Sequence, residues 1–297
     1  MDTRILTTFR RIVTSGGFSS AANELGYAQS TVSVHIQALE ETLGGPVFDR
    51  AGKKPVLTHL GKELLGLSEE MLRLEERVRN LASGSSEPSG ELNVATGESV
   101  MVSRLGESLA RFKHRYPRVV LRMRNSCCPV MIDWVLRGES DLAVLIMPPL
   151  NAPDLETRSL RREEMVFVAA HGKDRNLLLD ALDRGRLDEC FIHTEQGCSY
   201  RVFIENFFRS RGLVPEKTME LWSMEGIKQC VRSGLGISFV PFMYVRDALA
   251  DGALEQLAAP PLEESFVIQA VWRKTGALSP AAREFLSILE EDARSWR

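Results

Sequence analysis

A run of small and polar residues, from Ser83 to Gly90, divides this 297-residue sequence into two parts with different hydrophobic periodicity. Before the run, apolar residues recur three and four positions apart, as they do on one face of an amphipathic helix. After it, short apolar runs typical of strands alternate with helical patterns, which predicts parallel sheets with helices on their faces. The predicted strands are 92–96, 119–123, 141–147, 165–170, 190–193, 237–240 and 266–272, and the predicted helices are 100–116, 129–136, 200–211, 224–233 and one that begins at 279. The run itself has the composition of a flexible linker. We therefore predict a small helical domain followed by a larger α/β domain.

Composition narrows the class of protein further. A hydrophobic content of 44% and a mean hydropathy of -0.11 suit a soluble protein, and no apolar run is long enough to span a bilayer. The N-terminus lacks the apolar core of a secretory signal, so we expect a cytoplasmic location. The five cysteines have no paired-ligand spacing, so we expect no disulfide framework, metal or cofactor. The net charge of -3 excludes coating of nucleic acid by bulk charge, but it allows one small nucleic-acid-binding face.

Three short helical patterns occupy the start of the chain, at residues 3–13, 18–25 and 29–40. Gly26 permits a tight turn between the second and third patterns, and Ala21 and Ala22 allow the two helices to pack closely. The third helix begins with polar side chains, which is typical of the second helix of a helix-turn-helix. Residues 44–58 then predict two short strands joined by a basic turn. The whole arrangement indicates a winged helix-turn-helix.

Two sets of residues resemble one family along essentially the whole chain. The first comprises Phe18-Ser19-x-Ala21-Ala22-x-x-Leu25, Gln29-Ser30-x-x-Ser33-x-x-Ile36-x-x-Leu39-Glu40 and Leu57-Thr58-x-x-Gly61. This set resembles the winged helix-turn-helix of the LysR-type bacterial transcriptional regulators. The second set, Arg137-Gly138-Glu139-x-Asp141-Leu142-Ala143 and Val231-x-x-Gly234-x-Gly236-Ile237-x-x-x-Pro241, is similar to their effector domain. The resemblance implies a C-terminal two-lobed α/β domain like that of periplasmic binding proteins.

The start of the third helix carries the predicted base-reading residues. The predicted DNA-binding set is Gln29, Ser30, Thr31, Ser33 and His35 on this helix, with Arg50, Lys53 and Lys54 on the wing. Glutamine can pair with adenine, and hydroxyls can bond to bases or phosphates, whereas the wing cations suit phosphates or a minor groove. Val34 and His35 stand where many relatives carry basic or amide side chains, so the base preference cannot be transferred. A merely solvated helix face is the alternative.

A long apolar helical stripe follows the wing and includes Leu65, Met71, Leu72 and Val78. Nothing in the same stretch is expected to cover it, so we predict pairing with a second copy of the chain. Packing against the chain's own C-terminal domain is the alternative. The predicted domains are residues 1–60 (winged helix-turn-helix), 61–87 (dimerising linker helix and hinge) and 88–297 (effector-binding). In the last, lobe I covers about 88–162 and 266–297, and lobe II covers about 163–265.

The predicted effector site lies between the lobes, where strands end and helices begin. Free N–H groups at helix N-termini favour anions, so we expect a small, anionic effector. The resemblance implies that Ser99, Cys128, Ser199 and Arg201 line this cleft, with Arg201 the one fixed positive charge among them. Helix capping is an alternative role for the two serines. A thiol sensor is an alternative role for Cys128 with Cys198, because a helix N-terminus lowers the pKa of a thiol.

Other functional classes fit the sequence less well. The chain carries no nucleophile-elbow, phosphate-loop or zinc-protease motif, so we do not expect an enzyme. A periplasmic transport receptor would not carry residues 1–60. A dimer with two-fold symmetry calls for operator DNA with an interrupted inverted repeat. The resemblance further implies a homodimer that assembles into a homotetramer, and RNA polymerase is a candidate partner.

Overall fold

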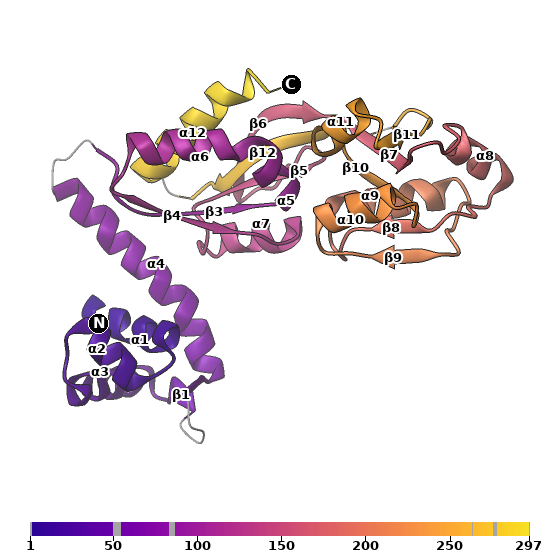
Figure 1. The fold of residues 1–297 in the computed structure, drawn as a ribbon. Coiled ribbons are helices and arrows are strands. Elements are labelled where there is room, and N and C mark those ends of the chain that lie inside the picture. The colour runs from indigo at the N-terminus through magenta and orange to yellow at the C-terminus, as the bar shows by residue number, and fades with distance from the viewer. Residues whose placement is uncertain (1, 50–54, 83–86, 263, 276–277, 297) are drawn as a thin grey trace. The chain divides into compact units, whose positions relative to one another are not determined.

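The computed structural model describes residues 2–49, 55–82, 87–262, 264–275 and 278–296. The chain separates into two compact units, one built from residues 1–86 and the other from residues 87–136 and 140–297 (Figure 1). Among the described residues, no helix has both the length and the apolar character needed to cross a membrane.

The first unit is a helical bundle with a small β-ribbon. Its elements are α1 (Thr3–Ser15), α2 (Phe18–Leu25), α3 (Gln29–Leu43), β1 (Phe48–Asp49), β2 (Val56–Leu57) and α4 (His59–Ala82). Gly26 joins α2 to α3 at a φ of 67°, a left-handed conformation that glycine adopts without strain. Ala21, Ala22 and Val32 are buried where these helices meet. The structure thus has the helix-turn-helix and the paired wing strands that the sequence predicts.

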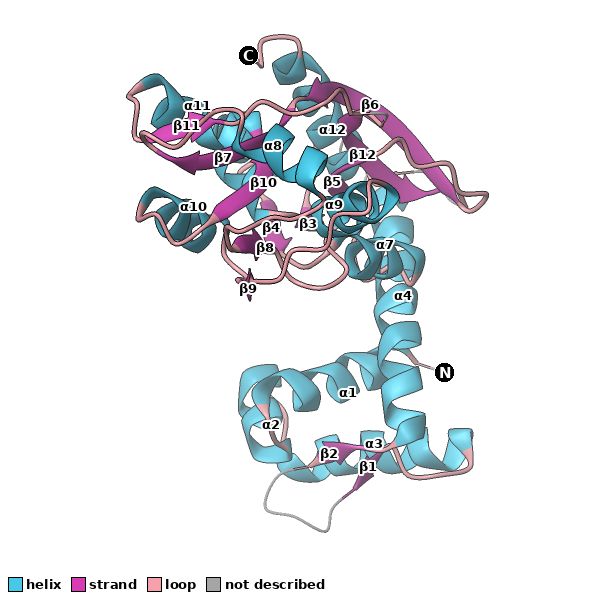
Figure 2. Cartoon of the chain, turned by 90° about the vertical axis from the view of Figure 1, so that its right-hand side faces the viewer, coloured by secondary structure: helices cyan, strands magenta, loops and turns pink. Residues whose placement is uncertain are grey.

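The helix α4 is longer than the other helices of this unit, as Figure 2 shows. Thr58 caps it, because its Oγ1 atom accepts the N–H of Gly61 at 3.1 Å. Two groups of apolar side chains lie on different faces of the helix. Leu64, Leu65 and Leu72 pack against the core of the first unit, and Leu67, Met71, Leu74 and Val78 are exposed. The expectation that the whole stripe is uncovered is therefore wrong for the first group, because α1 packs against α4.

The second unit contains two lobes, each built on a five-stranded sheet. The sheet of lobe I has the order β4 (Val119–Arg124), β3 (Gly90–Thr96), β5 (Leu142–Met147), β12 (Phe266–Arg273) and β6 (Leu155–Glu163). Its helices are α5 (Glu98–Val100), α6 (Gly106–Arg115), α7 (Cys128–Leu136) and α12 (Pro280–Ala293), and a π-helical turn, Met101–Leu105, joins α5 to α6. A π-helical turn within a helix often marks a functional position.

Lobe II repeats this plan with a second sheet. Its order is β11 (Leu254–Gln256), β7 (Met165–Ala170), β10 (Ile237–Pro241), β8 (Phe191–His193) and β9 (Thr218–Glu220). The helices are α8 (Leu177–Arg184), α9 (Ser199–Ser210), α10 (Met224–Arg232) and α11 (Phe242–Ala250). Aromatic rings fill much of the core, where Phe167 lies 4.9 Å from Phe239 and Phe191 lies 5.0 Å from Phe208, measured between ring centroids.

Both sheets are mixed, whereas the alternation of strands and helices predicted parallel sheets. In lobe I, β3 runs parallel to β4 and β5, but β12 is antiparallel to β5 and β6. In lobe II, β7 is antiparallel to its neighbours β10 and β11. The antiparallel strands flank the segments by which the chain passes from one lobe to the other and back. A returning strand needs no crossover helix, so the rule for parallel connections does not apply to it.

Candidate functional site

The first half of α3 presents a polar surface to solvent. Its exposed polar side chains are those of Gln29, Ser30, Thr31 and Ser33. Val32 and Ile36 are fully buried in the core of the first unit. This division follows from the helical period, which turns every third or fourth residue to the same side. The structure therefore leaves these predicted base-reading side chains free to contact another molecule.

His35 is held more firmly than its neighbours on this helix. Its Nδ1 atom lies 2.9 Å from the hydroxyl of Thr8, and its ring meets the edge of Tyr27 at a centroid distance of 5.8 Å. The Thr8 hydroxyl donates its proton to the carbonyl of Arg4, so the ring N–H of His35 is the donor to Thr8. The opposite ring nitrogen, Nε2, is then an acceptor, which suits an amino group of a base and not a phosphate.

Val34 is a residue of this face that the sequence reasoning did not include among the DNA contacts. Its side chain is 61% exposed, although it is apolar and lies between the polar residues of the third helix. An exposed aliphatic group on a recognition helix suits the methyl group of thymine. The signal in the sequence is an apolar residue that falls outside the buried stripe of α3.

The three wing cations, Arg50, Lys53 and Lys54, lie outside the described residues. The strands that flank them are antiparallel, with Phe48 opposite Leu57 and Asp49 opposite Val56. This pairing gives the described part of the wing the strand arrangement of a β-hairpin.

In the second unit, the predicted cleft residue Ser99 is engaged in a contact between the lobes. Its hydroxyl lies 2.8 Å from the hydroxyl of Tyr200, and both side chains are buried. Burial raises the pKa of Tyr200 well above its usual value, so the phenol is neutral at physiological pH. The hydrogen bond joins α5 of lobe I to α9 of lobe II.

A second contact between the lobes involves a carboxylate at a helix N-terminus. Glu98 Oε2 accepts the backbone N–H of Met224 at 3.0 Å, and Oε1 lies 3.4 Å from the hydroxyl of Ser223. The first turn of α10 therefore already carries a negative charge from the other lobe, where the helix dipole favours one. This N-terminus therefore offers little to an added anion.

Cys128 and Ser199 meet across the lobes. Ser199 Oγ donates to the carbonyl of Ile146 at 2.8 Å, and Cys128 Sγ lies 3.8 Å from Ser199 Oγ. Burial raises the pKa of the Cys128 thiol to about 12 and that of the Cys198 thiol to about 11. The lowering expected from the helix N-termini is thus outweighed by desolvation, and neither thiol ionises at neutral pH.

Arg201 is paired within its own lobe. Its Nε atom donates to Glu205 at 2.7 Å, and its guanidinium also donates to the carbonyl of Thr194 and to the carboxylate of Glu220. The side chain is 16% exposed. The sequence reasoning treated Arg201 as a fixed positive charge facing the cleft. The structure places two carboxylates against that charge.

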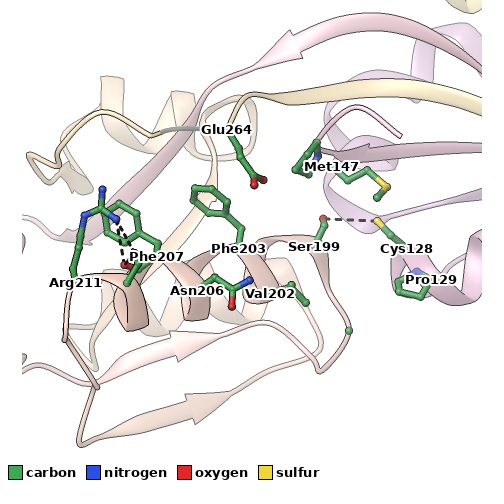
Figure 3. A pocket seen from close by; sticks show the side chains of 13 residues that line it. Cys128, Pro129, Met147, Ser199, Val202, Phe203, Asn206, Phe207, Arg211 and Glu264 are labelled. Atoms are coloured by element: carbon green, nitrogen blue, oxygen red, sulfur yellow. Dashed lines mark hydrogen bonds between the residues drawn. The ribbon is translucent and has the colours of Figure 1, made fainter. Parts of the chain in front are cut away.

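A pocket of about 480 Å³ lies between residues of the two lobes, alongside α9 (Figure 3). It is lined by Cys128, Pro129, Met147, Pro148, Gly197, Ser199, Val202, Phe203, Asn206, Phe207, Ser210, Arg211 and Glu264. Of the four predicted effector residues, Cys128 and Ser199 border this pocket, but Ser99 and Arg201 do not. The lining that sequence reasoning missed comes mainly from α9, where residues three and four positions apart share one face.

The described part of the chain offers little for a metal. It contains no group of three histidine, cysteine, aspartate or glutamate side chains that could hold a metal ion. Burial lowers the pKa of the His193 ring, and none of the described residues forms a hydrogen bond with its Nδ1 atom.

Comparisons with known sequences match both units. The family described as "Bacterial regulatory helix-turn-helix protein, lysR family" matches residues 3–62, and the family described as "LysR substrate binding domain" matches residues 85–294. The chain is 33% identical over 292 residues to the "Uncharacterized HTH-type transcriptional regulator YfiE" of Escherichia coli, and the alignment covers 98% of each chain.

Solved structures share the fold. A full-length OxyR variant from Pseudomonas aeruginosa superposes with a TM-score of 0.73 at 22% identity, covering 99% of this chain and 95% of the OxyR chain. The regulator CbnR in complex with its target DNA superposes with a TM-score of 0.65 at 19% identity, covering 100% of both chains. At these identities the likeness concerns the fold alone.

Proposed function

Because this chain belongs to the LysR family of bacterial transcriptional regulators, we propose that it reads operator DNA through the exposed face of α3 and responds to a small effector held between its two lobes. The chain is a DNA-binding regulator with an effector-binding domain. The observation that carries the first part of the proposal is the exposure of Gln29, Ser30, Thr31 and Ser33 on one helix that is otherwise anchored in a core.

The proposed DNA contacts divide into base reading and positioning. Gln29 suits an adenine edge, and Val34 suits a thymine methyl. Ser30, Thr31 and Ser33 are proposed to bond to bases or phosphates. The Nε2 atom of His35, an acceptor, is proposed to bond to an amino group of a base. The wing residues Arg50, Lys53 and Lys54 are proposed to contact phosphates, which fixes the protein on the duplex without reading its sequence.

We expect Gln29→Ala to weaken binding to the operator by about 1–3 kcal/mol and to relax the preference at one position of each half-site. The measurement is an electrophoretic shift with the DNA upstream of the protein's own gene and with random DNA of equal length. Gln37→Ala is the matched control, because Gln37 is exposed on the second half of α3 and bonds to Glu41. Equal losses on operator and random DNA for Gln29→Ala would contradict base reading by α3.

Dimerisation through α4 is a further part of the proposal. The exposed side chains of Leu67, Met71, Leu74 and Val78 are spaced three and four positions apart and share one face of the helix. An apolar helical face of this kind is well covered by a copy of itself. We propose a homodimer formed through α4, assembly into a homotetramer through the effector domains, and an operator with an interrupted inverted repeat.

We expect Leu74→Glu to halve the oligomeric mass of the full chain, because it places a charge in the middle of the paired apolar face. Sedimentation velocity measures the change. Lys62→Glu, at an exposed position of the same helix, should leave the mass unaltered. A monomeric unmutated chain, or a Leu74→Glu variant with the parent's mass, would overturn the proposed α4 interface.

For the effector, we propose the pocket beside α9. Cys128 and Ser199 border the pocket and are proposed to contact the ligand directly. Ser99 and Arg201 are proposed to contact the ligand near the N-terminus of α9. For Ser99, this contact requires opening of the hydrogen bond to Tyr200. For Arg201, it requires opening of the bonds to Glu205 and Glu220. The N-cap residue of α9, Cys198, makes no side-chain capping bond, which supports an effector that carries an anionic group.

The remaining expectations concern what the chain does in the cell. We infer that it acts in the cytoplasm, catalyses no reaction and needs no cofactor. RNA polymerase is a proposed partner at the promoter. These inferences follow from membership in a family of transcriptional regulators.

A further inference from the structure

The pocket beside α9 has a mostly apolar wall. Val202, Phe203 and Phe207 extend from one face of the helix, and Met147 and Pro129 lie on the side of lobe I (Figure 3). Pockets of a few hundred Å³ with such a lining hold small ligands by burying an apolar body, and a few polar groups determine the ligand's orientation. A volume of about 480 Å³ accommodates a side chain as large as an aromatic ring.

Besides the neutral side chains of Asn206 and Ser210, two polar features border this apolar space from different elements. The first is the N-terminus of α9, where Ser199 borders the pocket and the N-cap residue Cys198 makes no side-chain capping bond. The second is the carboxylate of Glu264, which Figure 3 shows directed toward the space between Phe203 and Met147. Glu264 has no hydrogen-bond or ion-pair partner among the residues that the structure describes.

The cationic side chain in the wall of the pocket, that of Arg211, is engaged by its own neighbours on α9. Arg211 lies with its guanidinium carbon 4.0 Å from the centre of the Phe207 ring, and it donates to the hydroxyl of Ser210 at 3.1 Å. Stacking on an aromatic face and hydrogen bonding to its own helix occupy this side chain. Two features therefore determine which charges a ligand should carry in this pocket. The helix N-terminus favours a negative group, and the carboxylate of Glu264 favours a positive one.

We propose that the effector is an apolar α-amino acid or a close analogue, bound as a zwitterion. Its carboxylate would meet the first turn of α9 beside Ser199, its ammonium group would face Glu264, and its apolar side chain would lie against Phe203 and Phe207. The inference rests on the proposed function, in that it takes this pocket as the effector site. A simple carboxylic acid satisfies the helix terminus but is repelled by Glu264, whereas a simple amine leaves the helix terminus without a partner.

The test compares three probes of similar size on the full chain: L-phenylalanine, 3-phenylpropionate and 2-phenylethylamine. Isothermal titration calorimetry should give at least about tenfold tighter binding of L-phenylalanine than of either of the others, because only the amino acid satisfies both polar features. Glu264→Gln should remove the advantage of L-phenylalanine over 3-phenylpropionate. Glu107→Gln removes an exposed carboxylate on α6, away from the pocket lining, and should leave the preference intact.

The outcomes separate this inference from the proposed function. If 3-phenylpropionate binds as tightly as L-phenylalanine and Glu264→Gln alters neither, the amino-acid class is wrong while an anionic effector in this pocket stands. If none of the three probes binds, and L-leucine and L-methionine also fail to bind, the inference is overturned. The proposed reading of operator DNA by α3 is then still tested, because the Gln29→Ala experiment does not depend on the effector. Binding of 2-phenylethylamine alone would overturn both the zwitterion and the anionic effector.

Discussion

Replacing Gly61 with alanine is expected to destabilise the DNA-binding unit by about 3 kcal/mol, because the new methyl group has no space. A Cβ atom at this position would lie 2.1 Å from the carbonyl oxygen of Val47 and 3.0 Å from the side chain of Leu57. That carbonyl also accepts the N–H of Thr58, whose hydroxyl caps α4. Relief of the clash therefore requires movement of the backbone that joins the wing to the long helix.

Gly66 provides a matched control on the same helix. A Cβ atom there meets nothing within 4 Å, so Gly66→Ala should stabilise α4 by up to about 1 kcal/mol through helix propensity. Hydrogen exchange of the amides of α1 to α4 in the full chain measures both effects. Equal protection in the two variants would show that the close approach of Gly61 to Val47 does not constrain the unit.

The loss of the positive charge of Arg104 is expected to cost the effector domain about 3–5 kcal/mol, as seen when one partner of a buried ion pair is removed. Arg104 lies in the π-helical turn of lobe I, and its side chain is 8% exposed. It lies 3.5 Å from the carboxylate of Glu163, which also accepts the N–H of Met243 at 2.8 Å. Arg104→Met leaves this carboxylate buried without its cation.

The stability lost in Arg104→Met should depend on pH through the ionisation of Glu163. Burial raises the pKa of Glu163 above its usual value even with Arg104 present. A carboxyl group whose pKa is raised in the folded state contributes stability below its unfolded pKa and loses it as the pH rises through the folded pKa. We expect Arg104→Met to raise the pKa of Glu163 further, because Arg104 lowers it in the parent. The difference in melting temperature between Arg104→Met and the parent should therefore shrink as the pH falls from 7 toward 5. Thermal unfolding across this pH range measures it.

Two further variants check the origin of the effect. Glu163→Gln in the Arg104→Met background removes the uncompensated charge and should restore part of the stability. Arg122→Met breaks the exposed pair with Glu91, in which the arginine side chain is 58% exposed, and should cost less than about 1 kcal/mol. Similar losses at Arg104 and Arg122 would contradict a special role for the buried pair.

Local patterns in the sequence were sufficient to predict the elements whose buried residues recur with a helical or strand period. The helices of the first unit are examples, because Leu6, Phe9 and Ile12 repeat at helical spacing and are all fully buried. The near-continuous apolar run of β5 is another, because a central strand is covered on both faces. These elements were predicted because the residues that define them are neighbours in sequence.

Elements with weak local patterns escaped prediction. The strand β6, with the sequence Leu-Glu-Thr-Arg-Ser-Leu-Arg-Arg-Glu, is strongly charged, yet it pairs along its length with β12 at the edge of the sheet. An edge strand exposes much of its surface, so its sequence need not be apolar. The helices α8 and α11 and the strands β9 and β11 were also missed, because each is short and its place is determined by packing.

The sequence by itself determined the order of the domains, the third helix and its polar face, because these depend on residues within a few positions of one another. Only the tertiary structure decided the surroundings of the predicted effector residues. Ser99 meets Tyr200, Glu98 caps α10, and Glu220 takes up part of the charge of Arg201. Glu264 borders the same pocket as Ser199. Most of these partners lie far apart along the chain, and burial and pairing are properties of surroundings that exist only once the chain has folded.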